Sequence, residues 1–331
     1  MADNSKIEWT DHTFNPWEGC QKIGPGCDHC YAETRNARFN GAAINWGPGA
    51  PRRRTSAANW HKPLKWNRED AAFAEKYGRK QRVFSPSLAD PFDNEVDPKW
   101  RADFFDLIDA TPNLDWLLLT KRIGNVTPML KAMGRECLPV HVWLGATIVN
   151  QEEADRDIPK LLSTPAVVRF LSCEPLLGPL DWIAPVARWQ QQTPIAGKTH
   201  IPWWHPLIDW IIAGGESGPG ARPMHPEWAR SLRDQCAAAG VAFHFKQWGE
   251  WLPDFEMATN RPQDDAEQSR FATCVWDTEA DAFAKTNGSW CDSDQWYFAR
   301  SYNDPEQSMT RIGKKRAGRL LDGVEHNGFP A

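Results

Sequence analysis

Short and almost uniformly apolar runs recur along the chain and alternate with segments of helical periodicity. The clearest runs are residues 82–88, 115–120, 140–147, 166–172, 208–213 and 241–246, with an earlier run at 7–15. Strands that are buried on both faces of a parallel sheet have this near-continuous apolarity, whereas strands with one solvated face alternate. We therefore expect each run to form a strand of one parallel sheet.

The segments between these runs have the pattern of amphipathic helices, most clearly at 98–110, 152–162 and 226–239. The last of them spaces its large apolar residues four apart and is followed by Gly240, a residue typical of a helix C-terminus. Alternation of strands and helices along a chain is the pattern of βα units. The predicted fold class is therefore α/β, with a partial or complete parallel (β/α) barrel.

Two stretches interrupt this pattern and suggest how the chain is divided. The barrel core is predicted to cover 1–252, with a cysteine-bearing loop at 19–31 and an insertion at 184–206. Residues 253–331 are predicted to form an acidic appendage and a basic C-terminal tail that pack on the barrel. The acidic part, 253–300, contains ten Asp and Glu against four Lys and Arg.

Polar side chains stand at or just after the ends of the predicted strands. In a parallel barrel these carboxyl ends meet at one mouth, which is where such enzymes keep their chemistry. The residues in question are Ser87, Asp90, Lys121, Arg122, Asn150, Glu174, Glu216 and Lys246. The plain alternative is that they belong to the polar turns with which any strand ends.

Three of the eight cysteines lie in one short segment, as Cys20-x6-Cys27-x2-Cys30. Three thiolates can hold a [4Fe–4S] cluster and leave one iron open to a substrate or cofactor. A structural zinc ion would need a fourth ligand, for which His12, His29 and His61 are candidates. No second C-x2-C pair occurs in the chain, which counts against a zinc ribbon.

The composition narrows the class of protein. The chain has 331 residues, 41% of them hydrophobic and 24% charged, so it can bury a large core and is not disordered. It has no apolar run long enough for a membrane helix and no export signal at its start, so we expect a cytoplasmic protein with no membrane partner. Its formal charge of −5 is wrong for a protein that coats nucleic acid nonspecifically.

Positive charge is nevertheless concentrated in residues 35–68, which contain eight Lys and Arg, no Asp or Glu, and three Trp. Basic residues interleaved with indoles suit contact with a nucleic-acid backbone and stacking on its bases. The residues that we expect to contact DNA or RNA are Arg52, Arg53, Arg54, Lys62 and Lys65. The alternative is a solvated charged loop whose Trp side chains belong to the core.

Several long segments carry a resemblance to a known family. They include WTDHTFNPWEGCQKIGPGCDHCYAE, WLLLTKR, VWLGATIVNQ, FLSCEPLLGPL and WIIAGGESGPGARPMHPEWARSLRDQC. A three-cysteine loop after a first strand, followed by βα repeats, resembles the radical S-adenosylmethionine superfamily. More closely, the chain resembles a phage-associated three-cysteine-motif family of unassigned function that is grouped with it.

The resemblance implies a barrel of the radical S-adenosylmethionine type with a [4Fe–4S] cluster held by Cys20, Cys27 and Cys30. In such enzymes the cluster, reduced by an external electron donor, cleaves S-adenosylmethionine to a 5′-deoxyadenosyl radical that abstracts a substrate hydrogen. By position, the expected cofactor-binding residues are His29, Tyr31, Ser87, Asp90, Lys121, Arg122 and Asn150. Glu174, Glu216 and Lys246 are expected to act in catalysis.

Two features depart from the common pattern of that superfamily. Its usual motif is C-x3-C-x2-C, whereas here six residues separate the first two cysteines. The segment Gly214-Gly215-Glu216 follows the sixth predicted strand, and no such segment follows the second. The identity of the residues that contact the cofactor is therefore only loosely implied.

Three functions remain open at this point. The first is a radical S-adenosylmethionine enzyme that modifies or repairs nucleic acid. The second is a binding protein without catalysis, stabilised by zinc or by a structural iron–sulfur cluster. The third is a radical enzyme acting on a peptide or a small metabolite. The sequence does not indicate an oligomeric state.

Overall fold

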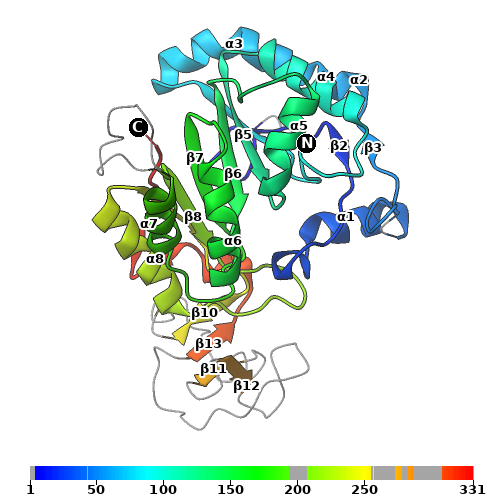
Figure 1. Ribbon diagram of the computed structural model, residues 1–331. Helices are drawn as coiled ribbons and strands as arrows, with labels where there is room; N and C mark the ends of the chain where they lie inside the picture. The colour runs from blue at the N-terminus through cyan, green and yellow to red at the C-terminus, as the bar shows by residue number, and fades with distance from the viewer. Residues whose placement is uncertain are drawn as a thin grey trace.

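A parallel sheet of seven strands forms the centre of the computed structural model, which describes residues 4–42, 44–193, 207–254, 256, 273–277, 282–285 and 308–330 (Figure 1). In spatial order the strands are β1 (His12–Thr13), β4 (Gln81–Ser85), β5 (Leu114–Thr120), β6 (Val142–Thr147), β7 (Val168–Cys173), β8 (Trp210–Gly214) and β9 (Ala242–Gln247). Every neighbouring pair is parallel, and the spatial order follows the order along the chain. This topology confirms the predicted α/β class as a partial (β/α) barrel.

The longer helices connect these strands and lie around the outside of the sheet (Figure 1). They are α3 (Lys62–Tyr77), α4 (Pro98–Asp109), α5 (Val126–Ala132), α6 (Gln151–Leu162), α7 (Ile183–Gln192) and α8 (Pro226–Ala239). Local sequence explains their ends: Asp97 accepts a hydrogen bond from the N–H of Lys99 at the start of α4, and Gly240 ends α8 with a φ of 67°. The hydrophobic pattern of the sequence does not predict α3, because this segment is too polar to indicate a buried face.

Aromatic side chains fill the barrel interior. Trp9, Phe84, Leu117, Trp143, Phe170, Trp210 and Ile212 form one buried cluster. The C-terminal residues complete it, because Phe329 lies 5.1 Å from Trp210 between ring centroids and the carbonyl of Gly328 accepts a hydrogen bond from the Trp210 indole. The larger cluster of buried apolar residues draws on α4, α6 and α8 as well as on the sheet. A filled interior leaves the strand ends as the place for chemistry.

A small antiparallel sheet follows the barrel, with strand order β10 (Trp251–Pro253), β13 (Ser308–Arg311), β11 (Thr273–Asp277) and β12 (Ala282–Lys285). Strand β10 crosses the predicted boundary at residue 252. The basic tail then returns to the barrel, where Phe245 and Gly328 donate backbone hydrogen bonds to the carbonyls of His326 and Phe243. Most of the acidic stretch and residues 194–206 of the predicted insertion lie outside the described residues.

The remaining described elements lie outside the succession of βα units, and all but α1 are short. Strands β2 (Trp17–Glu18) and β3 (Arg53–Arg54) pair with each other, as do β14 (Leu320–Leu321) and β15 (Val324–Glu325). Helices α1 (Tyr31–Asn40), α2 (Ala57–Trp60) and α10 (Lys314–Ala317) and the 3-10 turns η1 (Pro25–Cys27) and η2 (Ile123–Asn125) complete the inventory. Among the described residues, no helix is both long and apolar enough to cross a membrane.

The packing of the barrel interior predicts the effect of adding one methyl group. A Cβ at Gly145 would come within 2.3 Å of Cζ of Phe170, a ring that is fully buried and cannot move aside. We expect Gly145→Ala to lower the free energy of unfolding by about 1–3 kcal/mol, measured by urea denaturation. Gly124→Ala is the matched control, because its Cβ would meet only the flexible side chain of Lys160 at 3.6 Å. Equal stability of the two variants would contradict this view of the core.

Candidate functional site at the carboxyl ends of the strands

The cysteine loop, residues 19–30, lies against the carboxyl ends of strands β4 to β8. Gly26 packs so closely there that a Cβ would be 2.7 Å from Cγ1 of Val149, which follows β6, and 3.8 Å from Pro175, which follows β7. On either side of this contact, Tyr31 donates a hydrogen bond to the carbonyl of Ser87 after β4, and His29 meets Glu216 after β8. The structure therefore brings the loop and the predicted ring of strand-end residues together.

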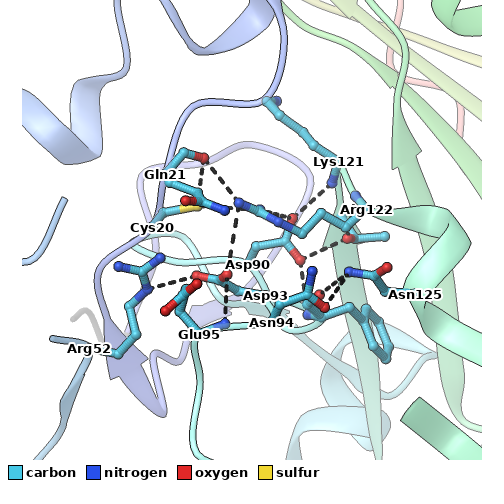
Figure 2. A network of polar contacts seen from close by, with 12 residues as sticks. Cys20, Gln21, Arg52, Asp90, Asp93, Asn94, Glu95, Lys121, Arg122 and Asn125 are labelled. Carbon is cyan, nitrogen blue, oxygen red and sulfur yellow. Dashed lines mark hydrogen bonds and ion pairs between the residues drawn. The ribbon is translucent and has the colours of Figure 1, made fainter. Parts of the chain in front are cut away.

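Arg122, at the end of β5, connects the loop to the barrel. Its Nη1 lies 3.5 Å from Sγ of Cys20 and 3.1 Å from Oδ2 of Asp90, and its Nη2 donates a 3.0 Å hydrogen bond to the carbonyl of Gln21 (Figure 2). The guanidinium is almost completely buried. Burial raises the pKa of the Cys20 thiol to about 11, although the charge of Arg122 opposes the shift. A metal ion would have to displace this proton, since thiolates rather than thiols are the ligands.

Asp90 fixes the position of Arg122. Its Oδ1 accepts hydrogen bonds from the hydroxyl of Thr120 and the N–H of Phe92, and its Oδ2 accepts them from the N–H of Lys121 and from Arg122. Both oxygens are thus fully used inside the protein. The predicted role of Asp90 in contacting a cofactor changes accordingly: the carboxylate is placed to orient Arg122.

Arg52 belongs to the same buried network, which alters its predicted role. Its Nε donates to Oδ2 of Asp93 at 2.7 Å (Figure 2). Its Nη1 donates to the carbonyl of Ala50 at 2.8 Å. Only 1% of the side chain is exposed, so we no longer expect Arg52 to contact a nucleic acid. Asp93, which also lies 3.9 Å from Arg122, is a member of this network that the sequence pattern did not indicate.

The other basic residues of 35–68 are also mostly paired. Arg53 forms an ion pair with Glu18, and Arg54 pairs with Asp103 at 2.6 Å while its guanidinium stacks over the Trp60 ring. Further along, the structure places Lys62 and Lys65 in helix α3, where Lys65 lies 3.7 Å from Glu69 one turn away. Contact of these residues with DNA or RNA stays a prediction, made weaker because their charges already have protein partners.

Glu216, after β8, holds the opposite side of the cysteine loop. Its carboxylate accepts hydrogen bonds from Nε, Nη2 and the backbone N–H of Arg222, and Nδ1 of His29 lies 3.0 Å from its Oε2. Arg222 also donates to Asp28 and to the carbonyl of Pro25 in the loop itself. Burial alone would raise the pKa of Glu216, but the hydrogen bonds from Arg222 and His29 hold it below its usual range.

Glu174 and Lys246 come together as predicted for residues of one mouth. The Nζ of Lys246 on β9 lies 3.0 Å from Oε1 of Glu174 after β7. Between them is Gly214 on β8, where a Cβ would be 2.8 Å from the same oxygen. Absence of a side chain at Gly214 thus allows the carboxylate to extend across β8, which gives a physical reason for a glycine at this strand end.

The other residues that we predicted to bind a cofactor make different kinds of contact in the structure. Asn150 accepts a hydrogen bond from the N–H of Glu153 and caps α6. The hydroxyl of Ser87 bonds to the side-chain amide of Asn15. Lys121 is half-buried beside Gly26, and within the described part of the chain its ammonium has no hydrogen-bond or carboxylate partner.

The three thiols of the loop are all free, Cys27 buried and Cys20 and Cys30 partly exposed. Over the described ranges, no three His, Cys, Asp or Glu side chains gather into a group that could hold a metal ion. The donor set itself fits a [4Fe–4S] cluster, because three thiols lie in one loop beside a cation. Of the candidate fourth ligands for zinc, His12 is bound to Gln81 and stacked on Trp66, whereas Nδ1 of His29 faces Glu216.

Arg222 and Asn15 are site residues that the sequence pattern missed. Arg222 falls inside the quoted segment that contains Gly214-Gly215-Glu216, so a search for a cationic partner of Glu216 within that segment would have found it. The side-chain amide of Asn15 accepts a hydrogen bond from the backbone N–H of Leu88 and donates one to the hydroxyl of Ser87. These bonds join the first strand region to the end of β4. Nothing in the spacing of polar residues indicates Asn15.

Comparison with known proteins assigns the family. A family model described as "Protein of unknown function (DUF5131)" matches residues 4–330, so the chain belongs to this family. No curated protein matches the chain. Two solved structures of spore photoproduct lyase are similar: a cysteine-to-alanine mutant with a dinucleoside spore photoproduct (TM-score 0.39, 12% identity) and a cysteine-to-serine mutant (TM-score 0.38, 13% identity). Each match covers 85% of this chain and 69% of the other.

The lowered pKa of Glu216 predicts how the anchor of the loop depends on pH. A carboxyl whose pKa is lower in the folded state stabilises the protein above its unfolded pKa, near 4.5, and loses this contribution as the pH falls through the folded value. We expect Glu216→Gln to lower the free energy of unfolding by about 2 kcal/mol at pH 7, measured with urea, and by progressively less below about pH 4.5.

The control is Glu227→Gln, which removes a largely exposed partner of Arg230 on helix α8. Its effect on the free energy of unfolding should stay within about 0.5 kcal/mol, both at pH 7 and below about pH 4.5. A Glu216→Gln deficit that persists undiminished in acid would show that the carboxylate charge is not what anchors the loop.

Proposed function

We propose that this member of the DUF5131 family is an iron–sulfur enzyme of the radical S-adenosylmethionine type. Cys20, Cys27 and Cys30 are its cluster ligands. One observation carries the proposal: the loop with the three free thiols lies on the carboxyl ends of the parallel strands, anchored there by buried ion pairs. In a (β/α) barrel this end is where reacting groups are held.

When bound, the cluster would supply the electron that cleaves S-adenosylmethionine to methionine and a 5′-deoxyadenosyl radical. The protein's own groups have positioning and electrostatic tasks around it. Arg122 lies beside Cys20 and supplies positive charge next to a sulfur that must become a thiolate. Glu216 is a positioning residue, since its carboxylate is already bound by Arg222 and His29.

Lys121 is the cation that we expect to bind the carboxylate of S-adenosylmethionine. It stands at the end of β5 next to Arg122, and its ammonium is unpaired among the described residues, whereas Arg122 is saturated by Asp90 and Gln21. Glu174 and Lys246 form a polar pair across neighbouring strand ends and are the candidates for contact with substrate. A nucleic acid is our proposed class of substrate, in preference to a peptide or metabolite.

Cluster binding can be tested directly by anaerobic reconstitution with iron and sulfide. We expect the wild-type protein to give, after reduction, the EPR signal of a [4Fe–4S] cluster, and addition of S-adenosylmethionine to change that signal because one iron lacks a protein ligand. Cys27→Ala should lose the signal. Cys137→Ala should keep it, because that cysteine is exposed and distant in sequence from the loop.

The same experiment separates the alternatives. A zinc-stabilised binding protein would give no EPR signal, and a purely structural cluster would not respond to S-adenosylmethionine. Either result, or equal loss in the Cys137→Ala control, would contradict the proposal.

Binding of the cofactor carboxylate can be tested through Lys121. We expect Lys121→Ala to retain the cluster but to bind S-adenosylmethionine about tenfold more weakly, since a charge-assisted hydrogen bond is lost. Equilibrium binding to the reconstituted protein measures the change. The control is Lys131→Ala, which removes an exposed lysine from helix α5. Unchanged affinity in Lys121→Ala would exclude the assigned role.

A further inference from the structure

A second concentration of positive charge lies where the C-terminal tail meets the end of β9. A pocket of about 370 Å³ opens there. Its polar lining consists of Glu8, Lys246, Gln247, Lys314, Lys315 and Arg319. Four of these side chains are cations and one is a carboxylate, although the whole chain is acidic.

Most cations of this pocket have no carboxylate partner in the described part of the chain; the exception is Lys246, which pairs with Glu174. Within the described ranges, neither Lys314 nor Lys315 has a carboxylate within ion-pair distance, and Nε of Arg319 is buried without a hydrogen-bond partner. Burial lowers the pKa of Lys314, and the charge of Lys246 lowers it further. Like charges gathered around an open volume favour an anionic ligand, because the ligand removes their mutual repulsion.

The residues of 35–68 offer a clear contrast. Arg52, Arg53 and Arg54 each have an acidic partner, Asp93, Glu18 and Asp103 respectively. Their charge is therefore largely used in holding the barrel together. Lys314 and Lys315 have no acidic partner within ion-pair distance in the described part of the chain, so they are the better candidates for contact with an anion outside the protein.

We propose that this pocket binds a phosphate group. A phosphate has several acceptor oxygens, which can be shared between the ammonium groups of Lys314 and Lys315 and the guanidinium of Arg319, all of which line the pocket. The volume is within the range of pockets that hold a small ligand. The phosphate could belong to a free nucleotide or to the backbone of a nucleic-acid strand.

The position of the pocket connects it to the strand-end site. Lys246 lines the pocket, and its Nζ lies 3.0 Å from Oε1 of Glu174. A ligand anchored by its phosphate in the pocket is thus adjacent to the pair that we propose to contact substrate. The phosphate site stands on its own, and only its role in holding a substrate rests on the proposed function.

Binding assays on the full chain, without reconstitution of a cluster, test the site. Two probes are used at low salt: deoxycytidine 5′-monophosphate, with deoxycytidine as its phosphate-free counterpart, and a fluorescein-labelled single-stranded oligodeoxynucleotide of about ten nucleotides. We expect the doubly substituted variant Lys314→Gln, Lys315→Gln to bind the phosphate-bearing probe at least about tenfold more weakly than the wild type. Circular dichroism checks that the variant is folded.

Arg316→Gln is the matched control, since Arg316 belongs to the same short helix but does not line the pocket. It should bind within about twofold of the wild type, as expected for a charge that does not contact the ligand. Tight binding of the mononucleotide would assign the site to a nucleotide, and binding of the oligonucleotide alone to a strand. Absence of binding to both probes, equal binding of deoxycytidine, or equal loss in Arg316→Gln would overturn the proposal.

These outcomes remain distinct from those that test the cluster. A protein that binds the phosphate probe but no iron–sulfur cluster would retain the phosphate site and lose the radical mechanism. A protein that binds the cluster but has no affinity for phosphate would retain the radical mechanism and lose the phosphate site.

Discussion

The buried guanidinium of Arg122 is the group on which the arrangement of the site depends. It touches the cysteine loop at Cys20 and Gln21 and the barrel at Asp90, so one side chain fixes the loop relative to the strand ends. A buried cation is tolerable only when it is paired and hydrogen-bonded, because its desolvation is otherwise too costly. Asp90 and Asp93 meet that requirement, and Asp93 in turn is neutralised by Arg52. The four side chains therefore act as one unit, in which loss of any member leaves an uncompensated buried charge.

The same network governs the chemistry of Cys20. Arg122 attracts a thiolate, but Asp90 and Asp93 lie close enough to oppose it, and burial disfavours any charge at all. The net result is a thiol that stays protonated at neutral pH in the absence of a metal. Arg122 therefore has two effects on Cys20: it holds the sulfur in place, and its charge offsets part of the cost of forming a thiolate. The second anchor, between Glu216 and Arg222, has no thiol in contact and serves position alone.

Much of this fold can be predicted from local pattern. The predicted strands overlap β4 to β9, and helix α8 was predicted with its exact bounds, because continuous apolarity and four-residue spacing report burial directly. The convergence of Glu174, Glu216 and Lys246 at one mouth also follows from parallel topology. What each polar residue does there cannot be predicted this way. Asn150 caps its own helix through the nearby Glu153. Asp90 is fully bonded within the protein and Arg52 is buried, because their roles are set by partners distant in sequence, Thr120 and Asp93.

The distribution of charged residues shows most clearly what a sequence pattern cannot predict. Residues 35–68 have no acidic residue of their own, so their sequence indicates a free basic surface, yet the fold supplies Glu18, Asp93 and Asp103 from neighbouring segments. In the tail, Lys314 and Lys315 lie in a run that the sequence already shows to be basic, and the fold adds Lys246 to them to form a positively charged pocket. A local charge count therefore misplaces the electrostatic surface of this protein. Recognition depends on the charge that is left unpaired after the fold has made its own ion pairs. At the described strand ends, this unpaired positive charge lies at Lys121 and in the tail pocket.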